Sequence, residues 1–360
     1  MRSSELTDIT KKKKHKTGTA ISRISACMLA AVFGLVPLSG CGNQNVTDTH
    51  IEATPVATEN ASTSTGSGEE DGVSAEPAVN LASALSVPTQ ITKIDDLYFI
   101  VDCYNNQVIY SDTTDRPLNE WFVMTSDIDK GHTVASDGSV YLVDDTERNR
   151  VLVFERDGYV FENTQVFEGI GTRPHFIVYN EADSNFYVWS SMTGEMYVMT
   201  HDPGSTDMYI SRIMKLDELD GVYVRSFTID GDSVYLVSGN SQIIEARLSD
   251  FKIKNRYPVP DQLAGMIQIM PVEGGYYVTV STDVHGNQDF ATIIYADKLS
   301  DLEEGKYTDI YSYFVGGGTP YYMGCIDGRY YLTEHRLPGH SIWSFDIGDD
   351  HMPADVRAIY

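Results

Sequence analysis

Two histidines and two arginines are candidates for a shared polar site in this 360-residue chain: His132, Arg173, His175 and Arg225. Each stands nine to fourteen residues before a tyrosine that lies in a short apolar run. An imidazole binds metals or moves protons near neutral pH. A guanidinium holds a carboxylate or a sulfate through paired hydrogen bonds. We therefore expect the four side chains to meet, if the apolar runs repeat in space as they do in sequence.

Three interpretations of the histidines stay open: half of a metal site, an acid–base pair, or polar residues bonded to neighbouring backbone. Catalytic zinc normally has three protein ligands, and the remaining histidines of the domain fall out of register. The arginines have an alternative role in ion pairs with acidic residues. The sequence therefore assigns no metal, and it leaves any cofactor unknown.

Matching positions in the other repeats add more polar side chains. They carry Gln268, the pair Tyr321 and Tyr322, and the pair Thr89 and Gln90. Tyrosine faces near an opening suit sugar rings or peptides, although packing between repeats explains tyrosines equally well. We predict a ligand site made of His132, Arg173, His175, Arg225, Gln268 and Tyr322.

The elements that must position these residues are short strands. Residues 140–143 and 151–154 are apolar and rich in β-branched and aromatic side chains, and Asp-Gly pairs bound them. Because the runs do not alternate, both faces of each strand should be covered. Six such units recur, with anchor tyrosines spaced 43, 46, 48, 42 and 54 residues apart. This period predicts an all-β, six-bladed propeller with four-stranded blades, and a sandwich of unrelated hairpins is the alternative.

The first two units resemble NHL-type propeller repeats. The resemblance rests on Tyr141-Leu142-Val143-Asp144 with Asn149-Arg150-Val151-Leu152, echoed by Ile100-Val101-Asp102 with Asn106-Gln107-Val108-Ile109. The last four units keep the apolar pattern but lose the Asp and Asn-Arg residues. The resemblance implies the architecture of the domain but little about its chemistry. In propellers generally, ligands sit over the axial channel, so we expect a site at the axial mouth.

The first forty residues have the pattern of an export signal. Lysines at 11–14 and 16 precede an apolar run from 26 to 38, which ends in Leu38-Ser39-Gly40-Cys41. This ending resembles a bacterial lipobox, in which Cys41 becomes the lipid-modified first residue. An ordinary signal peptide or an uncleaved anchor is the alternative. We therefore expect a signal peptide at 1–40 and lipidation at Cys41.

Composition and charge indicate how the domain is held outside the cell. Residues 41–81 are rich in Ser, Thr, Glu and Ala, which predicts a disordered tether before a propeller at 82–360. Beyond residue 40 there are 19 basic and 50 acidic residues, so we expect no nucleic-acid partner. Membrane contact should come through the lipid alone, in a bacterial envelope protein that faces outward.

Two further features remain ambiguous in the sequence. Cys103 and Cys325 lie in the first and last repeats, where a disulfide would staple the closed ring, and two free thiols are the alternative. The acidic corner 144–147 lacks the glycine of an EF-hand loop, so a solvated turn is favoured over a calcium site.

The function expected from these features is binding of an extracellular ligand without turnover. The partner stays unknown, and a small molecule, a glycan, a peptide or an envelope protein would each fit. One alternative is a lyase or hydrolase at the axial mouth, because some NHL-like propeller lyases carry axial histidines. Another is a scaffold subunit of an envelope complex. The sequence contains no phosphate-binding loop, nucleophile elbow or zinc-protease motif.

Overall fold

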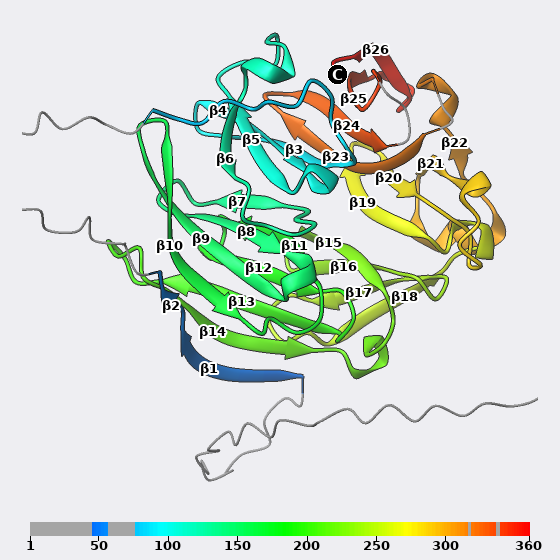
Figure 1. The fold of residues 1–360 in the computed structure, drawn as a ribbon. Coiled ribbons are helices and arrows are strands. Elements are labelled where there is room, and N and C mark those ends of the chain that lie inside the picture. The colour runs from blue at the N-terminus through cyan, green and yellow to red at the C-terminus, as the bar shows by residue number, and fades with distance from the viewer. Residues whose placement is uncertain (1–44, 57–75, 316–317, 336–338) are drawn as a thin grey trace, which may run out of the picture. The chain divides into compact units, whose positions relative to one another are not determined.

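Six sheets surround a common axis and form a six-bladed β-propeller (Figure 1). The computed structural model describes residues 45–56, 76–315, 318–335 and 339–360, in which every helix is a short 3-10 turn. Each blade contains four consecutive antiparallel strands. Blades 1 to 3 comprise β3 (Pro88–Ile94), β4 (Leu97–Asp102), β5 (Gln107–Ser111) and β6 (Phe122–Thr125); β7 (Val134–Ser136), β8 (Tyr141–Asp145), β9 (Arg150–Asp157) and β10 (Val160–Glu168); and β11 (Pro174–Asn180), β12 (Asn185–Ser190), β13 (Glu195–His201) and β14 (Met208–Lys215).

Blades 4 to 6 repeat this order: β15 (Val224–Asp230), β16 (Ser233–Ser238), β17 (Gln242–Arg247) and β18 (Ile253–Pro258); β19 (Met266–Val272), β20 (Gly275–Val280), β21 (Thr292–Ala296) and β22 (Thr308–Asp309); and β23 (Thr319–Ile326), β24 (Arg329–His335), β25 (Ile342–Ile347) and β26 (Pro353–Ala358). The predicted propeller and its six blades are thus confirmed. The turns that separate the strands follow the predicted Asp-Gly positions, and Gly138 and Gly158 both have positive φ.

Apolar side chains fill each space between neighbouring blades. Six buried clusters lie one at each interface, and the cluster between blades 2 and 3 joins Leu142 and Val153 to Val188 and Met199. Both faces of a blade are therefore buried, which explains why its strands are continuous apolar runs rather than alternating ones. The innermost strands β3, β7, β11, β15, β19 and β23 lie nearest the axis.

The ring closes between blades 6 and 1 without exchange of a strand. A buried cluster shares Ile91 and Trp121 of blade 1 with Tyr331 and Ile342 of blade 6. The C-terminal Tyr360 accepts a hydrogen bond from the Trp121 indole at 3.1 Å. Because Cys103 and Cys325 are both free thiols, the closure depends on packing and hydrogen bonds rather than on a disulfide.

Part of the predicted tether is structured. β1 (Val46–Glu52) pairs with β14 at the outer edge of blade 3, and β2 (Thr54–Pro55) pairs with β10 at the edge of blade 2. The prediction of disorder for 41–81 is therefore wrong for these strands, because unpaired outer edges offered them main-chain partners. Residues 1–44, with the signal and Cys41, and residues 57–75 lie outside the described residues. No helix among the described residues is long and apolar enough to cross a bilayer.

Candidate functional site

Aspartates fix the loops that lead into the innermost strands of blades 1 and 2. Each aspartate precedes a single-turn helix that follows the second strand of its blade, η1 (Cys103–Asn105) or η3 (Thr146–Arg148). Each carboxylate accepts a backbone N–H from the loop: Asp102 from Ser86 at 2.7 Å, and Asp145 from Asp129 at 2.8 Å. Both carboxylates are fully buried, so these bonds hold the loops firmly.

Asparagines of blades 1 and 2 bind the loops that lead into the innermost strands of blades 2 and 3. Asn106 and Asn149 follow the two short helices in the left-handed conformation. Their side-chain oxygens accept the backbone N–H of Lys130 at 3.2 Å and of Arg173 at 2.8 Å, respectively. Lys130 and Arg173 also have positive φ, of 58° and 60°. These two asparagines therefore fix the conformation of two basic residues in the loops that lead into blades 2 and 3.

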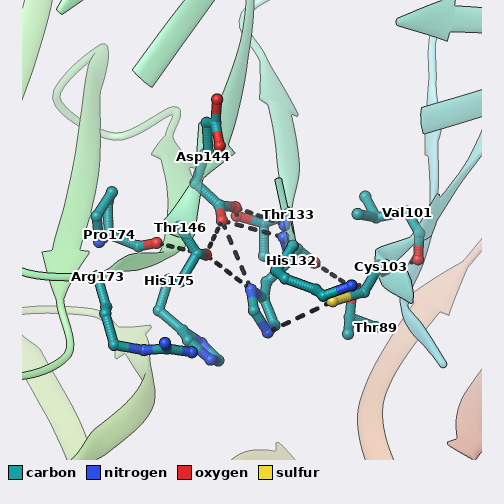
Figure 2. A network of polar contacts seen from close by, with 12 residues as sticks. Thr89, Val101, Cys103, His132, Thr133, Asp144, Thr146, Arg173, Pro174 and His175 are labelled. Carbon is teal, nitrogen blue, oxygen red and sulfur yellow. Dashed lines mark hydrogen bonds and ion pairs between the residues drawn. The ribbon is translucent and has the colours of Figure 1, made fainter. Parts of the chain in front are cut away.

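His132 lies in a buried polar network (Figure 2). Its Nδ1 is 2.8 Å from Thr146 Oγ1, and that hydroxyl is 2.8 Å from both Asp144 Oδ2 and the carbonyl of Pro174. The single hydroxyl proton can go to the Asp144 carboxylate or to the Pro174 carbonyl, and Thr146 can then accept a hydrogen bond from His132 Nδ1. The other ring nitrogen, Nε2, faces the Cys103 thiol at 3.9 Å.

Asp144 is the centre of this network. Its carboxylate is fully buried and accepts the backbone N–H of His132 at 3.0 Å and of Thr133 at 2.6 Å, together with the Thr133 hydroxyl at 2.8 Å. The interpretation of 144–147 as a solvated turn is wrong for its first three residues, because Asp144, Asp145 and Thr146 are all buried. The acidic corner holds the inner strands instead of facing water.

His175 contacts two phenols from other blades. Its Nε2 lies 3.1 Å from the Tyr223 hydroxyl and 3.4 Å from the Tyr321 hydroxyl. Burial, followed by the charges of His132, Arg225 and Arg173, holds the pKa of His175 well below its usual range. Burial also raises the pKa of Tyr321 well above the ordinary phenol value. His175 and Tyr321 are therefore both neutral at physiological pH.

The two predicted histidines are stacked on each other. Their ring centroids are 3.7 Å apart, and the ring planes are 25° from parallel. The nitrogen lone pairs lie in these nearly parallel planes and cannot converge on one ion, so this arrangement does not suit a shared metal. Among the described residues, no group of three His, Cys, Asp or Glu side chains is close enough to hold a metal ion.

Both predicted arginines lie near Tyr223 at this end of the inner strands. Arg225 Cζ is 4.8 Å from the centre of the Tyr223 ring, and interaction with the Tyr223 phenol helps to raise the pKa of Arg173, which burial lowers. Arg173 also pairs with Glu147. Within the described ranges Arg225 has no carboxylate partner, although acidic residues outnumber basic ones 52 to 26. The mouth thus presents one guanidinium free for an anion and a second that is only partly neutralised.

Two buried hydroxyls at the same end of the inner strands lack partners. Ser191 and Thr319 are at most 1% exposed, and their side-chain oxygens make no hydrogen bond to the described residues. Ser191 directly follows β12 beside the Arg173 carbonyl, which accepts its backbone N–H at 2.9 Å. Buried polar groups without protein partners commonly bind water or a ligand.

The structure places the remaining two predicted residues elsewhere. The Gln268 amide is occupied by the backbone of the next blade, because it donates to the Met323 carbonyl at 3.0 Å and accepts the Met323 N–H at 2.6 Å. Tyr322 lines a cavity of about 310 Å³ at the other end of the axis, together with Lys93 and Tyr179. Four of the six predicted residues therefore meet at the mouth.

Sequence reasoning missed four residues of this network: Cys103, Asp144, Thr146 and Tyr223. Asp144 lies near the end of β8, and Cys103 and Thr146 begin the short helices that follow β4 and β8, so a solvated turn, a calcium loop or a disulfide was the sequence-based interpretation of these positions. Tyr223 had a detectable signal, since it stands two residues before Arg225, directly before the innermost strand β15.

Comparison with known proteins identifies the architecture but no family. No family model matches the chain, and no curated protein matches it. Several solved structures are similar. A streptogramin B lyase has 15% identity and a TM-score of 0.52, and the match covers 77% of this chain and 85% of that one.

Two further structures are similar over most of their length. A catalytically inactive virginiamycin B lyase from Staphylococcus aureus, solved with quinupristin, has 13% identity and a TM-score of 0.54, with 79% and 88% of the chains covered. A putative 6-phosphogluconolactonase from Bacteroides uniformis has 14% identity and a TM-score of 0.54, with 78% and 90% covered. At these identities the similarity establishes a six-bladed propeller and does not decide between binding and catalysis.

Proposed function

We propose that this protein is an outward-facing bacterial envelope lipoprotein whose propeller binds an anionic extracellular ligand at the axial mouth without turning it over. Arg225 carries the proposal. A guanidinium on an aromatic face, with no acidic partner among the described residues of an acidic chain, is a ready receptor for a carboxylate or sulfate group. Arg173 would provide the second cation, and Ser191 would provide a buried hydroxyl.

Direct binding of sulfate tests this proposal. Equilibrium dialysis of the full-length protein against radioactive sulfate should show one site per chain. Arg225→Gln should weaken it at least tenfold, which corresponds to about 1.4 kcal/mol. Arg247→Gln is a matched control, because Arg247 lies in the same blade and pairs with Asp250 at 3.1 Å. Equal binding by both variants, or no binding by the native protein, would refute the proposed ligand class.

The proposed location has a separate test. If Cys41 carries lipid, the native protein should incorporate radioactive palmitate and sediment with membranes. Cys41→Ala should lose both properties, whereas Cys325→Ala should keep them. A soluble, unlabelled native protein would contradict the envelope assignment without bearing on the ligand.

A lyase is the second candidate function. Asp144, Thr146 and His132 form a hydrogen-bonded series, and a carboxylate that orients an imidazole in this way can support a general base. Lyases with solved propeller structures are similar in fold. The near-complete burial of both histidines favours binding over turnover. Incubation with quinupristin, followed by mass spectrometry, would reveal a cleaved product only if this second function is correct.

A further inference from the structure

Tyr223 connects the basic mouth to the buried histidines. Its hydroxyl lies 3.1 Å from His175 Nε2, its ring carries Arg225, and its phenol helps to raise the pKa of Arg173, which burial lowers. A neutral imidazole accepts at the nitrogen that carries no proton, so the phenol can donate its hydrogen bond to His175 Nε2. A hydrogen bond from the phenol favours the neutral state of His175, which burial and the charges of His132, Arg225 and Arg173 also favour.

The charges around the stacked pair come from every neighbouring loop. The acidic groups are Asp144 against His132, with Nδ1 and Oδ2 3.7 Å apart, and Glu147, which pairs with Arg173. The remaining titratable groups that face the two rings are Cys103 from η1, Tyr223 before β15, Tyr321 from β23 and the guanidiniums of Arg173 and Arg225. Two cations thus oppose a proton on His175, and one buried carboxylate favours a proton on the pair.

We infer that the mouth takes up an anion together with one proton, which the stacked pair His132–His175 accepts as the anion settles between Arg173 and Arg225. This inference rests on the proposed function, and it adds how that site is regulated. The ligand would bind more tightly as the pH falls, as suits a protein exposed to the acidity of its surroundings.

Two physical effects couple the anion to the proton. The first is charge, because an anion between the guanidiniums cancels the repulsion that keeps His175 neutral. The second is the direction of the Tyr223 hydrogen bond. An anion at the mouth would accept a hydrogen bond from the phenol O–H, and the phenol oxygen would then be free to accept a hydrogen bond from a protonated His175 Nε2. A hydronium ion of the solvent supplies that proton, so one of its O–H bonds breaks as the N–H bond forms, and the phenol keeps its own O–H bond.

Removal of the Tyr223 hydroxyl separates this second effect from the effect of the anion's charge on His175. Tyr223→Phe keeps the ring beneath Arg225 but cannot reverse a hydrogen bond. Tyr209→Phe is the matched control, since Tyr209 lies in β14 at the edge of blade 3 and its hydroxyl hydrogen-bonds Asp202. Both variants share the net charge of the native protein, so the general gain in anion binding at lower pH is the same in all three.

Sulfate dialysis of the full-length protein at pH 5.5 and 7.5 tests the coupling, because sulfate stays fully ionised over this range. Uptake of one proton increases affinity by at most about tenfold per pH unit. The native protein and Tyr209→Phe should bind at least tenfold more tightly at pH 5.5. For Tyr223→Phe, the logarithm of the ratio between the sulfate affinities at the two pH values should be less than half that of the native protein. In parallel, the ring C–H signal of His175 should titrate at higher pH in sulfate than in chloride.

The outcomes separate this inference from the proposed function. Sulfate that binds equally at both pH values, with the His175 signal unmoved, would overturn proton uptake and leave the anion site intact. A Tyr223→Phe variant with the full native pH dependence would overturn the role of the phenol. No sulfate binding at either pH would overturn the anion site itself.

Discussion

The side-chain oxygen of Asn149 accepts the backbone N–H of Arg173 at 2.8 Å, across the boundary between blades 2 and 3. Both residues have positive φ, a conformation that is strained for most side chains and tolerated by asparagine. The hydrogen bond therefore fixes an arginine backbone that would otherwise relax. The same contact joins Asn106 to Lys130 one blade earlier, which gives the recurring asparagine a physical role in shaping the loops that lead into the inner strands.

Substitution of Asn149 should weaken both stability and anion binding. Asn149→Ala removes the hydrogen-bond acceptor and puts alanine, which tolerates the left-handed conformation poorly, at a position of positive φ. We therefore expect the free energy of unfolding to fall by about 1–3 kcal/mol. Asn149→Gly keeps the conformation and loses only the acceptor, so it should recover part of the stability but not the sulfate affinity. Urea denaturation and sulfate dialysis measure the two quantities. Native affinity in Asn149→Gly would contradict the link between this hydrogen bond and Arg173.

The two domain cysteines should react very differently with alkylating reagents. Cys325 is exposed, whereas Cys103 is buried beside His132, and burial raises the pKa of its thiol to about 12. Iodoacetamide should therefore label Cys325 within minutes in the native protein and Cys103 only after unfolding. Peptide mass spectrometry distinguishes the sites. Protection of both thiols, removed by a reductant, would instead reveal a disulfide.

Sequence reasoning was most successful where one pattern recurred. Six tyrosine anchors in apolar runs fixed the blade number, since each strand is buried between two neighbours and must be apolar throughout. The meeting of His132, Arg173, His175 and Arg225 followed from the same register. The blade number and the meeting of these four residues both follow from a periodic pattern along the chain, which can be recognised in a single sequence.

The misses arose from contacts that cross between repeats. Gln268 has the register of a mouth residue, but the backbone of Met323 in the next blade occupies its amide. The polarity of the 41–81 segment concealed β1, because edge pairing needs only main-chain groups and leaves the side chains exposed. Neither partner is visible in the local composition of the segment concerned.

Stability should depend on pH through an ion pair between blades 2 and 3. His201 Nε2 lies 2.6 Å from Asp137 Oδ2. Burial lowers the pKa of His201, but the hydrogen bonds to Asp137 and Asp202 outweigh it and leave the pKa raised. Because the pKa is raised, the stabilisation by this ion pair is complete below the pKa of His201 in the unfolded chain, near 6.5. It is lost as the pH rises through the higher pKa of His201 in the folded protein.

His201→Asn should therefore destabilise the protein by roughly 1 kcal/mol at pH 5.5 and by clearly less at pH 9. Urea denaturation at the two pH values gives the difference, and His285→Asn, at an exposed turn, serves as the control. A constant difference between native protein and His201→Asn would show that the imidazole contributes only packing.

The paired N-terminal strand should open before the propeller does. Most side chains of β1 are exposed, so the strand is held mainly by its ladder to β14 and by an ion pair of 3.0 Å between Asp48 and Arg212. Segments with few buried contacts open locally at low free energy. Ile51→Pro removes a backbone donor within the ladder, where Ile51 pairs with Ile210.

This variant should increase hydrogen exchange in the β14 peptide 208–215 while shifting the melting temperature by only about 1–3 °C, because the six inter-blade clusters remain intact. Thr49→Pro is the matched control, since Thr49 lies in the irregularity between Asp48 and Ile51 and should affect exchange less. If Ile51→Pro instead lowered the melting temperature as strongly as a core substitution, β1 would be part of the cooperative folding unit rather than an addition to its rim.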